Sequence, residues 1–181
     1  HFDLRINWSM IEIHPDTPST GRPVSELGYS PQQWESMMNN LGRLAGEEGV
    51  RLRDHDFTTS SHRARLLAEA AEEAGPDIFY PLHRRLFTAF FVDGLNIGDE
   101  NVLTGLATAC KVPAEIIRQA WSDEKYVQKL ELNMAAAGQY AVRATPTVFF
   151  SEHVRLDGAL PFEAFLQAAR QGFEEQQASG N

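Results

Sequence analysis

A long block of helical sequence lies between two stretches of strand-like sequence, and this order most constrains the fold. Residues 2–10 alternate apolar and polar side chains, the period-two pattern of a strand with one buried face. Between 61 and 138 several helical patterns follow one another, separated by glycine and proline. Residues 147–150 and 154–159 then predict a β-hairpin. This order indicates an α/β core interrupted by a helical insertion.

Capping residues and apolar stripes predict the helix boundaries. Ser30 followed by Pro31 predicts a helix start, and Gly49 predicts the end of that helix. Its expected buried stripe is Trp34, Met37, Met38, Leu41 and Leu44. Later starts are expected at Thr59 or Ser60, Asp99, Pro113, Ser122 and Pro161, with a stop at Gly138. The last helix should turn Phe162, Phe165, Leu166 and Ala169 inward, and a flexible polar tail is expected over 176–181.

Net charge and cysteine count exclude several classes of function. The chain has 16 basic and 25 acidic side chains, a formal charge of -9, which argues against a nucleic-acid partner. No apolar run approaches the roughly 20 residues that cross a bilayer, so no membrane partner is expected. Cys110 is the single cysteine, so these residues form no internal disulfide. A lone thiol favours the reducing cytoplasm as the location.

The order of these segments, together with several quoted motifs, resembles the DsbA-like branch of the thioredoxin superfamily. The resemblance is closest to its cytoplasmic dithiol oxidoreductases with a helical insertion, and it covers roughly residues 2 to 170. The matching pieces are "LRINWSMIEIHP", "SHRARLLAEAA", "LFTAFFVDGLNIGDENVLTGLA", "AVRATPTVFF" and "LDGAL". The resemblance implies a thioredoxin-like core over 1–57 and 122–175, with an all-helical insertion over 58–121.

The same resemblance assigns the substrate-binding residues. It implies that Pro146 is cis and that the backbone of Thr145 faces the surface beside the catalytic cysteines. An extended substrate would then pair with that backbone, which is recognition by strand addition. Ala144 adjoins this turn, and His62 matches a family position that is often near the active-site groove. A capping or core hydrogen bond is an equally good interpretation of His62.

The catalytic motif of this family is absent from the sequence. The family uses a Cys-x-x-Cys pair at the N-terminus of the first helix, where the helix stabilises the thiolate. Matched to the family, His1 falls just before the second core strand, so we expect the first strand and the catalytic pair upstream of His1. Without that strand, the two apolar strands on either side of it would keep unmatched backbone groups. The alternative is a relic that has lost the motif.

Other candidate sites have simpler interpretations. Cys110 lies on a helix with an apolar inward face, where a lone cysteine is usually a small buried hydrophobe. The six histidines do not pair with each other or with cysteine at ligand spacing, so no metal site is expected. No cofactor is expected either, unless the chemistry uses glutathione.

Three functions remain open at this point. The first is a thiol–disulfide oxidoreductase that acts on protein or small-molecule thiols and disulfides through a mixed disulfide. The second is a glutathione-dependent isomerase or transferase of the 2-hydroxychromene-2-carboxylate isomerase or kappa class, which resembles this architecture and uses a serine in place of the first cysteine. The third is a non-catalytic peptide-binding module. The block "LFTAFFVDGLNIGDENVL" favours the oxidoreductase, and a homodimer is compatible with all three.

Overall fold

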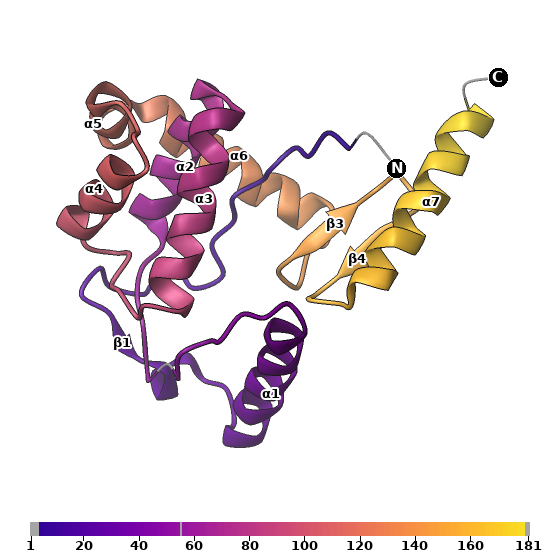
Figure 1. Ribbon diagram of the computed structural model, residues 1–181, viewed down its shortest axis with the longest axis horizontal. Helices are drawn as coiled ribbons and strands as arrows, with labels where there is room; N and C mark the ends of the chain where they lie inside the picture. Colours follow the sequence, from indigo (N-terminus) through magenta and orange to yellow (C-terminus); the bar gives the residue numbers. More distant parts are fainter. Residues whose placement is uncertain (1–3, 55, 180–181) are drawn as a thin grey trace.

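The computed structural model describes residues 4–54 and 56–179, and it is mainly helical with two small sheets (Figure 1). The first part of the chain forms β1 (Arg22–Pro23), a 3₁₀ helix η1 (Val24–Leu27), α1 (Pro31–Glu47) and β2 (Phe57–Thr58). The middle forms α2 (His62–Ala74), α3 (Pro76–Phe91), α4 (Glu100–Ala109), α5 (Ala114–Ser122) and α6 (Glu124–Gln139). The last part forms β3 (Thr147–Phe149), β4 (Arg155–Asp157) and α7 (Phe162–Ser179).

Helices α2 to α6 pack into one cluster around α2 (Figure 1). Every residue of α2 from 64 to 71 is buried, because α3, α5 and α6 cover different sides of it. Leu67, Leu82 and Leu103, on three of these helices, are fully buried. Burial of one such leucine stabilises the fold by about 2 kcal/mol. The cluster therefore holds most of the apolar core, in line with the helical insertion predicted from the sequence, whose boundaries at 57/58 and 121/122 stay a prediction.

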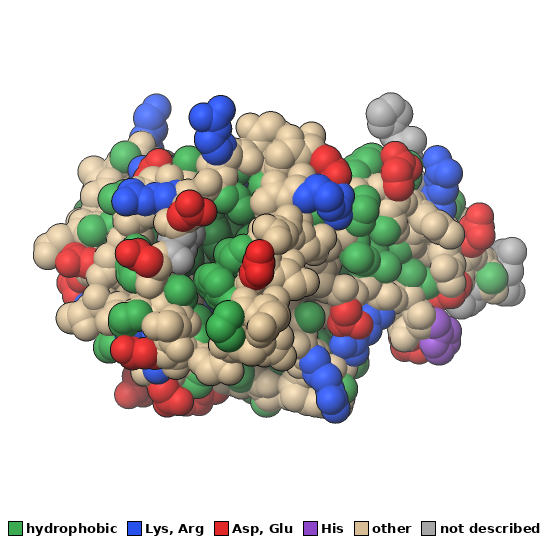
Figure 2. Space-filling model, turned by 90° about the horizontal axis from the view of Figure 1, so that it is seen from below, with side chains coloured by type: hydrophobic (Ala, Val, Ile, Leu, Met, Phe, Trp, Pro, Cys, Tyr) green, Lys and Arg blue, Asp and Glu red, His purple; other side chains and the backbone are tan. Residues whose placement is uncertain are grey.

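The first predicted helix is confirmed, but it packs loosely. Ser30 and Gln33 form a reciprocal capping box at the start of α1. Gly49 lies just past its end with φ 71°, as expected for a C-terminal glycine. The predicted buried stripe is wrong in degree, because no side chain of α1 is fully buried and Met37 is 44% exposed. Helix α1 stands apart from the cluster, and the face seen from its side shows hydrophobic side chains around a central hollow (Figure 2).

Two of the later helix starts differ from the prediction. Asp99 caps α4 as expected and accepts hydrogen bonds from the backbone N–H groups of residues 101 and 102. Ser122 is the last residue of α5, and Asp123 caps α6 in its place. Thr59 does not cap α2, since its hydroxyl donates to the Ser19 carbonyl at 3.2 Å. The hydroxyl of Ser60 accepts a long bond, 3.3 Å, from the N–H of His62, and Ser61 is the residue that precedes α2.

The strand predicted over residues 2–10 is not formed in the described part, residues 4–10. Leu4 and Ile6 are more than half exposed, while Trp8 and Met10 pack against the helical cluster. The ring of Trp8 lies 4.4 Å from that of His83 on α3. A strand needs a neighbour that fills its backbone hydrogen bonds, and no described residue pairs with this segment. Of the apolar side chains in this alternating segment, only those in its second half therefore contact the helical cluster.

The predicted β-hairpin and last helix are confirmed, with two corrections. Strands β3 and β4 pair antiparallel, with Val148 opposite Leu156. Helix α7 lies beside β4. It also approaches the end of β3 closely, since a Cβ added at Gly172 would lie 2.8 Å from the Cβ of Phe150. Phe162 is 66% exposed, contrary to expectation, because it begins α7, whereas the buried Ala168 and Ala169 lie farther along the helix. Residues 176–179, expected in a flexible tail, continue α7, and residues 180–181 lie outside the described part.

No helix within residues 4–54 and 56–179 combines the length and apolar character that a bilayer crossing requires.

Candidate functional site

The candidate site begins at the C-terminal end of α6. The N–H of Ala141 donates to the carbonyl of Gly138, and that of Val142 donates to the carbonyl of Ala137 at 2.8 Å. These two bonds are a Schellman motif, in which the residue after the cap adopts the left-handed conformation. That residue is Ala141, with φ 49°, although glycine is the usual choice. The stop predicted at Gly138 lies one residue before the observed last residue of α6, Gln139, and the left-handed cap position is Ala141 rather than that glycine.

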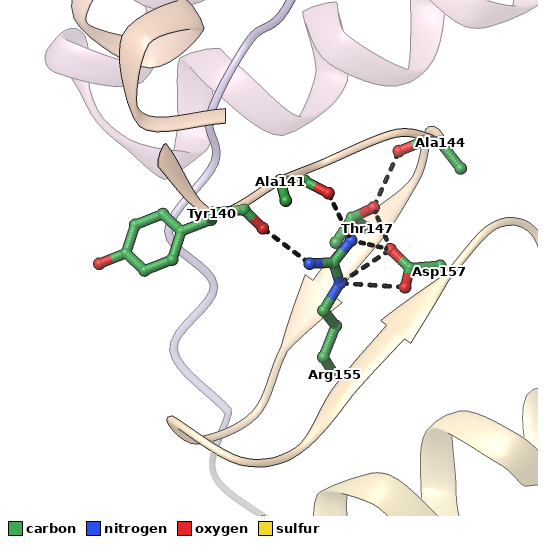
Figure 3. A network of polar contacts seen from close by, with 6 residues as sticks. All are labelled: Tyr140, Ala141, Ala144, Thr147, Arg155 and Asp157. Atoms are coloured by element: carbon green, nitrogen blue, oxygen red, sulfur yellow. Dashed lines mark hydrogen bonds and ion pairs between the residues drawn. The ribbon is translucent and has the colours of Figure 1, made fainter. Parts of the chain in front are cut away.

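Arg155 on β4 connects this helix end to the hairpin (Figure 3). Its Nη1 donates to the carbonyl of Tyr140 at 2.7 Å, and its Nη2 donates to that of Ala141 at 3.1 Å. Its Nε lies 2.9 Å and 3.0 Å from the two carboxylate oxygens of Asp157. A cation beside the last carbonyls of a helix is also favoured by the helix dipole. One guanidinium thus satisfies a helix terminus and a carboxylate together.

A second set of bonds fixes the start of the hairpin. The hydroxyl of Thr147 lies 2.8 Å from the carbonyl of Ala144 and 2.9 Å from the carboxylate of Asp157, and its one hydrogen is shared between these two acceptors. The N–H of Gly158 donates to the carbonyl of Pro146 at 2.7 Å. The segment from 142 to 146 is therefore held at both of its ends.

The turn expected to bind substrate lies between these anchors. The Thr145–Pro146 peptide bond is cis. Thr145 and Pro146 are exposed and Ala144 is half-buried. Within the described part of the chain, no hydrogen bond is made by the backbone N–H or carbonyl of Thr145. The turn thus offers an accessible donor and acceptor on a backbone whose neighbours are fixed.

Asp157 is held in its charged form by the same network. Hydrogen bonds from Arg155 lower the pKa of this carboxyl below its ordinary value. Partial desolvation opposes this change, and the hydroxyl of Thr147 adds to it. The carboxylate is therefore ionised throughout the neutral range, which keeps its ion pair with Arg155 intact.

Two aromatic rings lie beside the network. Tyr140 is 60% exposed and Phe149 is 45% exposed, and their ring centroids are 5.6 Å apart. The guanidinium of Arg155 lies over the ring of Phe149 at 5.4 Å from its centroid. Because residues 149 and 155 are opposite each other in the hairpin, this contact lies on the face that also carries Thr147 and Asp157. An apolar, partly open surface thus adjoins the turn.

His62 lies in a different set of contacts. It is the first residue of α2, and its Nδ1 is 3.7 Å from the carboxylate of Glu12. Arg65, which is buried, makes an ion pair with the same carboxylate. Among the described residues, no hydrogen bond or ion pair joins His62 to Thr145 or Pro146. These contacts join the start of α2 to the N-terminal segment, and a role of His62 in substrate binding stays a prediction.

Cys110 lacks the features of a reactive thiol. It follows α4, is partly buried against the helical core, and has its Sγ 3.8 Å from the carbonyl of Pro81. Burial raises the pKa of this thiol, and the nearby Arg85 offsets that rise only in part. A thiol that is held protonated is a poor nucleophile.

No group of three or more potential metal-ligating side chains gathers within residues 4–54 and 56–179. A shallow cavity of about 510 Å³ lies between α4 and α5, with Arg63 and Trp121 in its lining. It shares no residue with the turn at 144–146. The polar network at the hairpin is therefore the candidate site.

Sequence reasoning missed the residues that hold this turn in place. Asp157, which the sequence analysis did not single out, ends β4 and binds Arg155. Arg155 carried no signal, because its partners at 140 and 141 are fifteen and fourteen residues away. The alternation of β4, which puts residues 155 and 157 on one face, was the available hint.

Comparison with known proteins decides the family. The sequence model of the DsbA-like thioredoxin domain family matches residues 1–170 of this chain. The chain belongs to this family. It is similar in structure to a probable DsbA oxidoreductase from Streptomyces coelicolor, with a TM-score of 0.73 and 24% identity over 90% of this chain and 72% of the other. A second solved structure, from Nitrosomonas europaea, gives a TM-score of 0.65 at 15% identity, over 81% of this chain and 76% of that one.

A curated relative is the ClpXP adapter protein SpxH of Bacillus subtilis, 24% identical over 140 residues. The match covers 74% of this chain and 46% of the relative, so the chain spans about half the length of that protein. The family and the thioredoxin-like fold predicted from the sequence are confirmed.

Proposed function

We propose that this protein is a thiol–disulfide oxidoreductase that binds an extended substrate segment along the backbone of Thr145. The observation that carries the proposal is the exposed residue Thr145 between two fixed anchors, whose backbone groups bond to no described residue. A substrate strand that donates to its carbonyl and accepts from its N–H gains main-chain hydrogen bonds without a specific side chain. Ala144 and Pro146 complete the surface on either side.

The chemical step is a two-electron exchange. A protein thiolate attacks one sulfur of the substrate disulfide, forming a mixed disulfide and releasing a substrate thiolate. A second protein thiolate then attacks the mixed disulfide, so that the protein becomes oxidised and the substrate leaves as a dithiol. The 181 residues contain one cysteine, so a reaction that uses a cysteine pair needs a thiol from outside them. Cys110, with its raised pKa, is not proposed as either thiol.

A second candidate function is protein binding without exchange chemistry. The name of SpxH as an adapter and the single, protonated cysteine of these residues favour it. In this case the Thr145 edge would capture an extended segment of a protein partner, with no covalent step. The same surface serves both candidates, and only the presence of a reactive thiolate separates them.

Insulin reduction by dithiothreitol tests the proposal. We expect the full-length protein to accelerate precipitation of the insulin B chain several-fold over dithiothreitol alone. Cys110→Ala should keep this acceleration, because that thiol takes no part. A rate equal to the dithiothreitol background refutes the oxidoreductase. Retention on immobilised glutathione without insulin reduction would instead indicate the glutathione-dependent class, with glutathione as its cofactor.

A further inference from the structure

Arg155 makes the polar connection between the end of α6 and the hairpin, beside the ring contact of Tyr140 with Phe149. On one side it binds the carbonyls of Tyr140 and Ala141 at the end of α6, and on the other it binds Asp157 on β4. Its side chain is 29% exposed, so these bonds are partly shielded from water. Residues 142–146, between the two carbonyls that Arg155 binds and the start of β3, form the turn that carries Thr145 (Figure 3).

We propose that Arg155 is a positioning residue for substrate binding at Thr145. This inference rests on the proposed recognition by strand addition. Thr145 has no backbone hydrogen bond of its own among the described residues, so its position depends on the anchors to either side. The hairpin anchor is made by Thr147 and Asp157, and the helix anchor is made by the guanidinium of Arg155. Arg155 sets the distance between the two anchors.

The geometry requires a guanidinium. Its planar fork presents Nη1 to one carbonyl, Nη2 to the next, and Nε to the carboxylate. A lysine ammonium supplies the charge for Asp157 but lacks the fixed directions that reach both carbonyls. Glutamine at 155 removes the charge and leaves Asp157 without its cation. Arg155→Lys should therefore remove the bonds to the two carbonyls, and Arg155→Gln should in addition remove the charge that pairs with Asp157.

Binding of an extended chain without thiols isolates this role from the exchange chemistry. The probe is a fluorescein-labelled insulin B chain whose cysteines are carboxamidomethylated, and the readout is fluorescence anisotropy with the full-length protein. We expect Arg155→Gln to raise the Kd about tenfold and Arg155→Lys to raise it about threefold. Arg170→Gln, an exposed arginine on α7, is the matched control and should leave the Kd unchanged.

A second substitution separates positioning from stability. Ala141→Gly removes the cost of the left-handed conformation at the helix end, so it should restore much of the stability that Arg155→Gln loses. The turn in the double variant is still disconnected from the hairpin, so the weakened Kd should persist. Stability is followed by urea unfolding of each variant, alongside the anisotropy titration.

The outcomes are distinct. A Kd that stays about tenfold weaker in the double variant, with its stability restored, supports the positioning role. A Kd that recovers together with stability overturns it, because Arg155 would then act on the fold alone. An Arg155→Gln variant that binds as tightly as the parent also overturns it. If the parent protein does not bind the modified B chain, the proposed recognition edge fails first, and the inference fails with it.

Discussion

Replacing Ala141 with glycine should stabilise the protein. Ala141 has φ 49°, and an L-residue in this region costs about 1.5 kcal/mol. Glycine avoids that cost but gives the unfolded chain more freedom, which costs about 0.7 kcal/mol. The side chain of Ala141 is exposed, so its removal sacrifices little apolar contact. The expected net gain is about 0.8 kcal/mol, or a rise in Tm of about 2–3 °C for a chain of this size.

Two control variants make the prediction sharp. Lys111 has φ 62° and follows α4 in the same hydrogen-bonding motif, so Lys111→Gly should stabilise the protein by a similar amount. Ala135→Gly makes the same chemical change at an exposed position inside α6, where it should cost about 1 kcal/mol. The free energy of unfolding in urea measures all three. If Ala141→Gly destabilises the protein as Ala135→Gly does, the left-handed assignment of residue 141 is wrong.

The remaining predictions concern three ionisable groups. Lys129→Met should destabilise the protein by about 2 kcal/mol, because the fully buried Glu69 loses the ammonium that lies 2.6 Å from its carboxylate. Urea unfolding measures this difference, and equal stability of variant and parent would contradict the prediction. Since the folded pKa of Asp157 lies below its unfolded value of about 3.9, its stabilising effect should be complete above that pH and disappear as the pH falls through the folded pKa. The stability difference between the parent and Asp157→Asn should therefore vanish in acid, and a constant difference from pH 7 to pH 2 would exclude the ion pair with Arg155. Iodoacetamide should alkylate Cys110 more slowly than free cysteine at pH 8, because burial raises the pKa of the thiol, and an equal rate would show that it is accessible and ionised.

Local signals in the sequence predicted the local structure well. Ser30, Gly49 and Asp99 lie at the predicted helix ends, because a cap depends on bonds within a few residues. Ser122 and Asp123 are both good capping residues, and the sequence alone did not decide between neighbours. The end of α6 was predicted to within one residue, but its left-handed cap was not, because Ala141 occupies that position and carries no glycine signal.

Long-range structure was harder to predict for physical reasons. The alternation in residues 4–10 is a genuine strand pattern, yet pairing depends on a neighbouring strand that no described residue supplies. Arg155 reaches the helix end across the hairpin, and no spacing rule links an arginine to carbonyls fifteen residues earlier. The family resemblance predicted Thr145 and Pro146 as substrate contacts, whereas the bonds that hold the turn could be seen only in the structure.

The backbone amide of Thr145 offers the most direct test of the central claim, that this edge pairs with an extended substrate. Amide hydrogen exchange at Thr145 can be measured by NMR with and without saturating carboxamidomethylated insulin B chain. Because this N–H makes no hydrogen bond among the described residues, we expect fast exchange in the free protein and at least tenfold slower exchange in the complex. Unchanged exchange at Thr145 in a saturated complex would show that the substrate binds elsewhere.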